Sequence, residues 1–535
     1  MNSITSSILD GLNDAQRRAV TTIDGALLIV AGPGTGKTLT IVRRIAWLIS
    51  QGVNPEGILA VTFTNRAARE MRERAETLLG KAASSIFIGT LHLLGLTILR
   101  EFSSAELTLY NREEQAELIK TLSKKTGTRA QDFIEKISRI KNFVDPLDEE
   151  CKELFENYET ILKHNHAVDF DDLVRNPLTI LEQNPSAAVL SKFSHIMVDE
   201  YQDINPAQYR LIRLLSQKSD SICAIGDSDQ AIYGFRGASA SGFLRFGSDF
   251  KDARTVALTK NYRSSAVVLT ASNSVIRNNQ DRIEKNIVPT LGQGSCIGVF
   301  SLPDERTEGE LIVQEIEARI GGTSHYQQSR SGRDVDRPSE AFCFSDVAVI
   351  YRTNAQAKAI EETFRASGIP YQVLGRKSSL QAKTLDETIA YLHSLVDPDA
   401  EVLGQPTTCE AKLLTAADFF DPRANTVTLT TMHTAKGLEF RVVFIAGVED
   451  GLLPFTVTKR NADIEEERRL FYVGMTRAKE DLFLLHVRNR FLYGQRLSPL
   501  PSPFLKEIPD NLIVRITVPD KVKKKKEPDT QMGLF

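Results

Sequence analysis

The amino-acid sequence predicts an α/β protein with parallel sheets, and two observations lead to this prediction. Between residues 25 and 79, short apolar runs alternate with segments in which apolar residues recur at helical spacing. A second pattern of this kind begins beyond Asn261. Because strands that alternate with helices usually pair in parallel, each pattern predicts one parallel sheet.

In the first half, strands are expected at residues 26–30, 58–62, 195–198 and 222–225. Helices are expected over residues 38–50 and 65–79. The region 91–190 has helical periodicity and faces rich in Glu and Lys. We therefore predict a helical insertion that interrupts the first sheet.

In the second half, strands are expected at residues 297–300, 347–351, 426–430, 442–445 and 482–487. The segment 321–338 is rich in Gly, Ser, Gln and Arg, which predicts a surface loop. After Pro509 the chain becomes polar and ends with a lysine run at 521–526. Because such a segment buries little apolar area, this tail is expected to be disordered, with the lysine run as a solvated linker.

Length and composition narrow the class of protein. A chain of 535 residues has room for three or four domains, and 41% apolar with 25% charged residues is typical of soluble globular proteins. The sequence has neither an apolar run as long as a membrane span nor a signal peptide at its start, so a cytoplasmic location is expected. The net charge of −3 gives no global positive field, so nucleic acid would have to bind in a local groove. The five cysteines lack any C-x-x-C pair and are expected to be reduced packing residues.

A glycine-rich loop separates the strand at 26–30 from the helix at 38–50. Such a loop points backbone N–H groups at phosphate oxygens, while Lys37 adds a positive charge and Thr38 can hold Mg²⁺. The strict pattern has glycine where this chain has Ala31. The sequence predicts that a nucleoside triphosphate is held by Ala31, Gly32, Pro33, Gly34, Thr35, Gly36, Lys37 and Thr38.

Two polar segments follow later strands of the first sheet. Asp199 and Glu200 end the strand at 195–198, and in phosphoryl-transfer sites one acid holds Mg²⁺ while a second group orients or deprotonates the attacking water. A solvated strand end is the alternative. Gln230 has the chemistry to sense a γ-phosphate. Tyr233 and Phe235 could stack on bases, or they could be core aromatics beside a loop.

With these segments, further motifs resemble the superfamily 1 DNA helicases of the UvrD, Rep and PcrA type. The motifs are L-N-x-x-Q-x-x-A-V (12–20), V-T-F-T-N (61–65), G-T-L-H (89–92), V-D-F-D-D-L (168–173), N-Y-R-S (261–264), Y-R-T-N-A-Q (351–356), H-T-A-K-G-L-E-F (433–440), E-E-E-R (465–468) and T-R-A (476–478). They occur in the order of the family.

The resemblance implies two RecA-like P-loop motor domains with parallel sheets. The first would comprise residues 1–88 and 185–265, and the second residues 266–375 and 426–508, with the helical insertion at 89–184. Relatives insert a whole mobile domain, called 2B, where this chain has residues 376–425, so a reduced connector is expected there. Residues 509–535 would be the disordered tail.

The resemblance also places ATP between the two motor domains, with Mg²⁺ held by Thr38 and Asp199. It assigns catalysis to Asp199, Glu200, Gln230, Arg263 and Arg477, of which the two arginines would contact the γ-phosphate. Gln16 would read adenine, Tyr262 would stack on it and Glu439 would bind the ribose.

By the same resemblance, a groove for single-stranded DNA would be lined by Phe63, His92, Tyr233, Phe235, Arg352 and His433. Tyr493 aligns with the aromatic pin at the duplex junction, and a tyrosine in the core of a hairpin is the alternative. Asp169, Asp171 and Asp172 could suggest a metal site, but a solvated helix start is expected and fits the corresponding motif of the family.

Two positions depart from the family pattern. Leu39 stands where relatives place an arginine on the adenine, so the cation–π contact is absent and looser nucleotide binding is expected. Phe235 replaces a tryptophan. Because the 2B domain regulates unwinding in the family, translocation is expected here, and processive unwinding by a monomer is left open.

The last five residues, Q-M-G-L-F, resemble the peptide with which bacterial proteins dock onto the replication sliding clamp. Gln531 could form hydrogen bonds while Leu534 and Phe535 fill an apolar pocket. An ordinary frayed tail is the alternative.

The sequence therefore predicts a DNA-stimulated ATPase that moves 3′ to 5′ on single-stranded DNA, as a helicase or translocase in repair or replication. One alternative is a translocase that strips proteins with little unwinding. The other is an ATP-gated DNA-binding adaptor recruited by the clamp.

Overall fold

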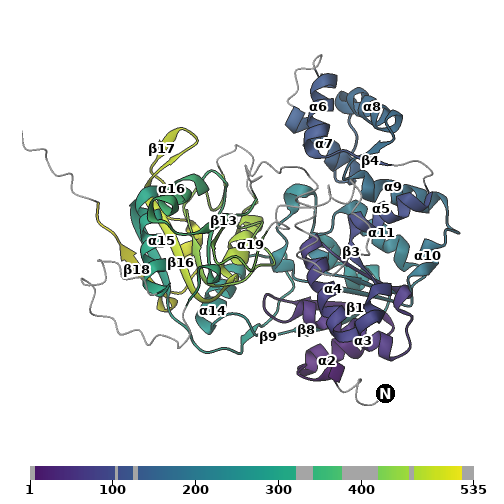
Figure 1. Cartoon of the computed structure of the whole chain (residues 1–535), viewed down its shortest axis with the longest axis horizontal. Coiled ribbons are helices and arrows are strands. Elements are labelled where there is room, and N and C mark those ends of the chain that lie inside the picture. Colours follow the sequence, from purple (N-terminus) through teal and green to yellow (C-terminus); the bar gives the residue numbers. More distant parts are fainter. Residues whose placement is uncertain are drawn as a thin grey trace, which may run out of the picture.

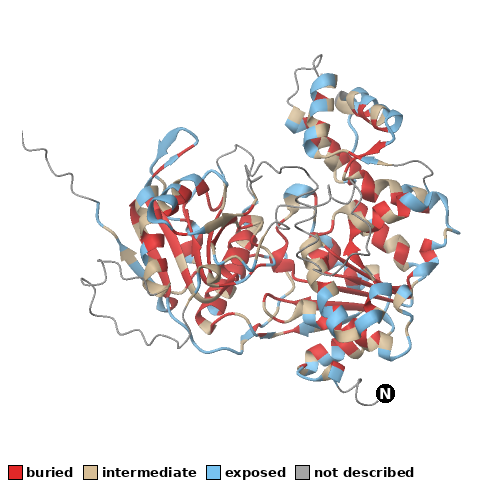
Figure 2. Ribbon diagram, viewed as in Figure 1, coloured by how far each residue is buried: buried red, intermediate tan, exposed pale blue. Residues whose placement is uncertain are grey.

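The computed structural model describes residues 7–102, 107–123, 130–320, 342–375, 420–456 and 463–520. Two lobes, each built on a parallel sheet, lie side by side, and a group of helices projects from the first lobe (Figure 1). Buried residues follow the sheets and the inner faces of the helices (Figure 2). Among the described residues, no helix is long and apolar enough to cross a membrane.

The first sheet consists of six parallel strands. In order across the sheet they are β3 (Phe87–Thr90), β2 (Ile58–Thr62), β6 (His195–Val198), β7 (Ser221–Gly226), β1 (Gly25–Ala31) and β8 (Arg254–Leu258). One face packs against α2 (Asp14–Thr21), α3 (Lys37–Ser50) and α4 (Asn65–Leu79). The other face packs against helices that include α11 (Pro206–Ser216), α12 (Ser241–Leu244) and α13 (Phe246–Asp249). Burial on both faces explains why these strands are nearly continuous apolar runs.

The order of the strands brings three sequence segments to one edge of the first sheet. β6, β7 and β1 are neighbours in parallel register, so their carboxyl ends lie together. The loops that follow them carry Asp199, Gln230 and the glycine-rich segment. This edge is where ligands of open α/β sheets usually bind.

The region between β3 and β6 is mostly helical, as predicted. Its elements are α5 (Leu91–Phe102), β4 (Thr108–Leu109), α6 (Arg112–Ser123), α7 (Ala130–Lys141), α8 (Glu149–His164), β5 (Ala167–Val168), α9 (Asp172–Gln183) and α10 (Val189–Lys192). The short parallel pair of β4 and β5 was not predicted. Helices α6, α7 and α8 build a core of their own, whereas α5 and α9 contribute apolar side chains to the core of the first lobe.

The prediction of a solvated helix start at Asp169, Asp171 and Asp172 is wrong. Asp169 and Asp172 are buried, and each has an Oδ2 atom 2.8 Å from Nζ of the buried Lys141. Asn142 donates a hydrogen bond to Asp171 over 2.6 Å. Because charges removed from water need a partner, these ion pairs and this hydrogen bond hold the end of α7 against the start of α9.

The second sheet is parallel apart from one hairpin strand. Its order is β13 (Tyr371–Val373), β14 (Val427–Thr431), β12 (Val347–Tyr351), β15 (Phe440–Ile445), β16 (Ala478–Leu492), β11 (Ile297–Asp304) and β18 (Ile513–Thr517), and β17 (Gln495–Leu497) pairs antiparallel with β16. Helices α14 (Ala266–Ile276) and α19 (Ile464–Met475) cover one face, and α15 (Glu305–Ile320) and α16 (Ala357–Ser367) cover the other.

The tail predicted to be disordered from residue 509 begins with ordered structure. β18 adds to the edge of the second sheet, with Ile297 of β11 opposite Ile513. The polar sequence around this short segment hides its strand pattern, and pairing with β11 supplies the hydrogen bonds that hold it. Residues 521–535, including the predicted clamp peptide, lie outside the described residues.

The predicted strands of both sheets are confirmed, but β11 (Ile297–Asp304) and β16 (Ala478–Leu492) extend well beyond the predicted limits of 297–300 and 482–487. The predicted loop at 321–338 and residues 376–419 of the predicted connector lie outside the described residues, and the domain boundaries stay predictions. Cys151, Cys223, Cys296 and Cys343 are free. Cys296 and Cys343 are exposed, so the expectation that the cysteines are packing residues is wrong for these two.

Candidate nucleotide and nucleic-acid site

The glycine-rich loop connects the end of β1 to the start of α3. Gly34 and Gly36 have φ of 68° and 85°, which glycine adopts without strain. A Cβ atom on Gly34 would lie 2.5 Å from Cβ of Arg263 and 2.7 Å from Nδ2 of Asn261. Asn261 also donates a hydrogen bond to the carbonyl oxygen of Pro33 over 2.7 Å. The predicted phosphate loop is thus held by the segment that carries Arg263.

Glu200 lies between lysines of the two lobes. Its Oε1 atom is 3.4 Å from Nζ of Lys37, and its Oε2 atom is 3.5 Å from Nζ of Lys436, which follows β14 of the second lobe. Glu200 has φ of 50°, a left-handed conformation that is costly for a non-glycine residue and frequent at functional sites. The sequence predictions gave no role to Lys436, although it stands between His433 and Glu439 in one motif.

Burial and charge shift the pKa values of Asp199 and Glu200 in opposite directions. Burial, and then the charge of Glu200, raise the pKa of Asp199 to about 7. Burial also acts to raise the pKa of Glu200, but the ammonium groups of Lys37 and Lys436 outweigh it and hold that pKa below its usual range. Of the two acids, Glu200 is therefore the one held in the ionised form at pH 7.

The oxygen donors at this edge fit Mg²⁺. Thr38 lies in the first turn of α3, and Asp199 follows β6, two strands away from β1 in the sheet. Mg²⁺ usually takes one or two protein oxygens and completes its shell with phosphate oxygens and water. No cluster of three His, Cys, Asp or Glu side chains that could hold a metal occurs among the described residues.

Gln230 is buried in the loop that follows β7. Its Nε2 atom donates to Oδ2 of Asp227 over 2.8 Å. Gln202 links this pair to Glu200, because it accepts from the backbone N–H of Asp227 over 2.9 Å and donates to Glu200 over 2.5 Å. Lys436 donates to the backbone carbonyl of Gln230 over 2.7 Å.

The two predicted arginine fingers have different partners. Arg263 forms an ion pair of 2.7 Å with Glu439 of the second lobe, and Glu439 also pairs with Lys479 at 2.7 Å. Arg477 is buried and donates to the carbonyl oxygens of Val473 and Leu438 within its own lobe. Burial, and then the charge of Arg263, lower the pKa of Arg477 to about 9. This ion pair joins Arg263 to Glu439 of the other lobe, the residue that is predicted to bind the ribose.

The predicted adenine residues lie at the other end of the loop. Gln16 is buried and donates to the carbonyl oxygen of Thr35 over 3.0 Å. Tyr262 is 47% exposed, and its hydroxyl accepts from Asn13, the residue that caps α2. Leu39 is exposed on the first turn of α3. An open tyrosine face next to the loop is available for stacking on a base.

An aromatic cluster lies where the lobes meet, beside the predicted nucleotide site. Phe63 stacks on Tyr233 with ring centroids 4.6 Å apart, and Phe235 packs edge-on against His433 at 5.3 Å. Phe235 is 59% exposed, so the alternative of a core aromatic is wrong for it. Arg236 lies 5.5 Å from the centroid of Tyr233. These rings and this cation are the groups that single-stranded nucleic acid needs for stacking and charge.

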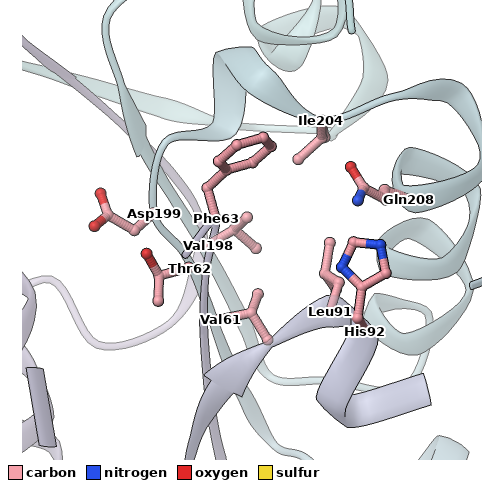
Figure 3. A pocket seen from close by; sticks show the side chains of 9 residues that line it. All are labelled: Val61, Thr62, Phe63, Leu91, His92, Val198, Asp199, Ile204 and Gln208. Atoms are coloured by element: carbon pink, nitrogen blue, oxygen red, sulfur yellow. The ribbon is translucent and has the colours of Figure 1, made fainter. Parts of the chain in front are cut away.

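A pocket is lined by Phe63 of the aromatic cluster and by Asp199. Figure 3 shows Phe63, His92 and Asp199 among the side chains that line it, with Thr62 and Gln208. Burial, and then the charge of Arg236, lower the pKa of His92 to about 4. Burial, and then Arg352, lower the pKa of His433 to about 3. Both imidazoles are therefore neutral at pH 7 and can serve as stacking and hydrogen-bonding groups.

Arg352 acts on His433 of this cluster through its charge, whereas Tyr493 belongs to the hairpin of β16 and β17. Arg352 forms a bidentate pair with Glu467 through contacts of 3.0 and 2.7 Å, so its guanidinium is engaged within the second lobe. Tyr493 lies at the tip of the hairpin of β16 and β17 and is 57% exposed. The alternative of a hairpin-core tyrosine is wrong.

Comparisons with known proteins identify the family of this chain. A family model described as the UvrD/REP helicase N-terminal domain matches residues 12–251, and one described as the UvrD-like helicase C-terminal domain matches residues 256–403 and 410–489. The chain is 31% identical over 656 aligned positions to the ATP-dependent DNA helicase PcrA of Staphylococcus aureus strain Mu50, covering 95% of this chain and 87% of that protein. PcrA of Staphylococcus epidermidis strain RP62A is also 31% identical, with 95% and 88% covered. The chain therefore belongs to the UvrD/REP helicase family.

Proposed function

We propose that this chain is an ATP-driven motor on single-stranded DNA, with DNA-stimulated ATPase and 3′ to 5′ helicase activity. Its relatives are named ATP-dependent DNA helicases, and 95% of this chain aligns with them. The observation that carries the proposal is the position of Glu200 between Lys37 of the phosphate loop and Lys436 of the second lobe. A nucleotide bound there touches both lobes.

In this proposal, each residue of the site has a separate role in phosphoryl transfer. Lys37 and the loop bind the phosphates, while Glu200 accepts a proton from the attacking water and Gln230 orients that water. Thr38 and Asp199 would hold Mg²⁺, which would supply positive charge for the phosphate oxygens. Arg263 and Arg477 stabilise the charge that develops on the γ-phosphate.

Bound DNA affects ATP hydrolysis through the segment that follows β14. His433 contacts the aromatic cluster, and Lys436 lies 5.4 Å from the ring centroid of Tyr233 while it also touches Glu200. A base that displaces these rings would move Lys436 relative to Glu200. This linkage supports stimulation of the ATPase by single-stranded DNA and argues against an adaptor without motor output.

The test of the proposed function is an ATPase assay with and without single-stranded oligonucleotide. Wild type is expected to hydrolyse ATP faster with DNA, whereas Lys37→Ala loses nucleotide binding and Glu200→Gln binds MgATP but loses turnover by about 10²-fold or more. Equal rates with and without DNA, under conditions in which ATP and DNA both bind, would contradict the motor and favour the adaptor.

We propose single-stranded DNA and junctions formed during repair or replication as the substrates. Stripping of bound proteins with little unwinding is the second candidate, and it follows from the shorter chain, because the alignment with PcrA spans more positions than the 535 residues present. Unwinding of a forked duplex with a 3′ tail, measured beside displacement of streptavidin from a biotinylated strand, separates the two. A 5′-tailed fork is the control for polarity.

We further propose the bacterial sliding clamp as a partner of the C-terminal peptide, on the basis of Gln531, Leu534 and Phe535 in the sequence. Deletion of residues 531–535 is expected to abolish capture by immobilised clamp and to leave the ATPase unchanged. Capture at the level of the full chain rejects this partner.

A further inference from the structure

The loop that carries Gln230 is held by a segment that returns from the second lobe. Residues 277–290, here called the return segment, leave α14, lie against the first lobe, and lead back to β11. β10 (Val288–Pro289) of this segment pairs with β9 (Lys260–Asn261). A Cβ atom on Gly32 would lie 2.1 Å from Cδ1 of Ile287, so the segment also rests against the phosphate loop.

Two cations of the return segment hold two buried carboxylates of this loop. Lys285 contacts Asp227 and lies 2.5 Å from Oδ2 of Asp229. Arg282 forms a bidentate pair with Asp229 through contacts of 3.0 and 2.6 Å. Asp227, Asp229 and the Lys285 side chain are at most 1% exposed. Because buried charges gain their stability from close partners, these two acids can take up few other positions.

One of these carboxylates fixes the side chain of Gln230. Oδ2 of Asp227 accepts from Nε2 of Gln230 over 2.8 Å, while Oδ1 of Asp227 contacts Lys285. The amide orientation of Gln230 is thereby set by a carboxylate whose other oxygen is bound to the return segment. The backbone N–H of Asp227 also donates to Gln202, the residue that donates to Glu200.

The second lobe contacts the same loop from another side. Lys436 donates to the backbone carbonyl of Gln230, and Tyr472 of α19 lies buried near the two carboxylates. Burial, and then Asp227 and Asp229, raise the pKa of Tyr472. The loop is thus enclosed by the first lobe, the return segment and the second lobe.

We propose that Lys285 is a positioning residue that sets the orientation of Gln230 through Asp227, and so links the relative position of the lobes to turnover of the γ-phosphate. This inference rests on the proposed function. Lys285 does not touch the reacting atoms. It acts because the return segment begins and ends in the second lobe, so that movement of this lobe is transmitted to Asp227 and from there to Gln230.

The test is a double-mutant cycle in single-turnover ATP hydrolysis with saturating single-stranded DNA. Lys285→Met alone is expected to lower the rate constant about 10- to 100-fold, as misplacement of a positioned group does, while ATP KM and DNA Kd change by less than about threefold. In the Gln230→Ala background, the same substitution is expected to lower the rate less than about threefold, because the group it positions is already absent.

Lys141→Met is the matched control, since Lys141 is also a buried lysine held by two aspartates but lies in the helical insertion. Its effect on the rate is expected to be equal in both backgrounds. Lys285→Gln, which keeps a donor for Asp227, replaces Lys285→Met if the melting temperature shows that the latter does not fold.

Equal losses from Lys285→Met in the wild-type and Gln230→Ala backgrounds would overturn the positioning role, as would a raised KM with an unchanged rate constant. Wild type without DNA stimulation would instead refute the proposed function. The two failures are therefore distinguishable.

Discussion

At the scale of single residues, the ionisation of a buried side chain depends on the charged groups packed against it. Arg490 is 3% exposed and lies between two buried acids, with its Nη2 atom 3.0 Å from Oε2 of Glu308 and 2.6 Å from Oε1 of Glu449. When both carboxylates are ionised, the single guanidinium leaves a net negative charge in the core. Burial raises the pKa of Glu308 to about 7, with the attraction of Arg490 opposing this rise and Glu449 adding to it.

Glu308→Gln is therefore expected to make the stability of the second lobe less sensitive to pH. The folded-state pKa of Glu308 is raised above its unfolded value, so the ionised group costs stability increasingly as pH rises from about 4.5 to about 7. The variant should gain about 2 kcal/mol more, relative to wild type, at pH 8 than at pH 5. Urea unfolding followed at both pH values measures the difference.

The control for this substitution is Glu310→Gln on the same helix, because Glu310 is partly exposed and pairs with the exposed Arg306. Its effect on unfolding should be small at both pH values. A Glu308→Gln effect that is the same at pH 5 and pH 8 would mean that the Glu308 carboxyl does not titrate in this interval.

At the scale of elements, the hairpin of β16 and β17 combines a fixed base with an exposed tip. Arg490 anchors β16 three residues before the turn. The turn residues Tyr493 and Gly494 have φ of 52° and 79°, the left-handed conformations of a tight hairpin turn. The aromatic ring is thus presented to solvent on a strand end that the core holds in place.

Tyr493→Asn is expected to reduce unwinding of a forked duplex about tenfold or more and to leave the ATPase stimulated by single-stranded DNA within about twofold of wild type. Asparagine tolerates the left-handed backbone, so the turn is kept while the ring is lost. Strand separation and ATPase are measured on the same preparation.

Tyr493→Phe serves as the control for the hairpin, because it keeps the stacking surface and removes only the hydroxyl. Loss of DNA-stimulated ATPase in Tyr493→Asn would place the ring in the translocation groove rather than at the junction.

At the scale of the whole molecule, the candidate site is completed only when both lobes are present. Arg263 pairs with Glu439, and Lys436 approaches Glu200, so each lobe supplies charge to groups of the other. Arg477 lies within the second lobe and donates to its own backbone. In the proposed function, closure of the lobes on a nucleotide brings this arginine toward the γ-phosphate.

Arg477→Lys is expected to lower the rate constant of ATP hydrolysis about 10²-fold or more while nucleotide affinity changes less than about fivefold. Lysine keeps the charge but lacks the planar fork with which arginine spans phosphate oxygens. Single-turnover hydrolysis and binding of a fluorescent nucleotide measure the two quantities.

Arg319→Lys is the matched control for the second lobe, because Arg319 pairs with Glu315 and Asp481 and takes no part in the proposed site. It should hydrolyse ATP at the rate of wild type. Weaker nucleotide binding in Arg477→Lys with an unchanged rate constant would assign Arg477 to ground-state binding.

Sequence patterns were sufficient where the information is local. The strands at 58–62, 195–198 and 347–351 were predicted at their observed limits, because a short apolar run between turn signals has few other solutions. The glycine-rich loop and the acids after β6 were found by their spacing. β18 was missed, because its pattern is short and its pairing partner β11 is more than 200 residues away.

The sequence by itself determined two parallel sheets and the identity of the residues at their carboxyl ends, because backbone periodicity and contiguous motifs depend on neighbours in the chain. Only the tertiary structure decided which charges meet: Lys436 with Glu200, Lys285 with Asp227, and Lys141 with Asp169. These pairs join residues 28 to 236 positions apart, and their strength comes from exclusion of water by the folded core. Burial and long-range pairing are properties of the packed molecule, which no local pattern contains.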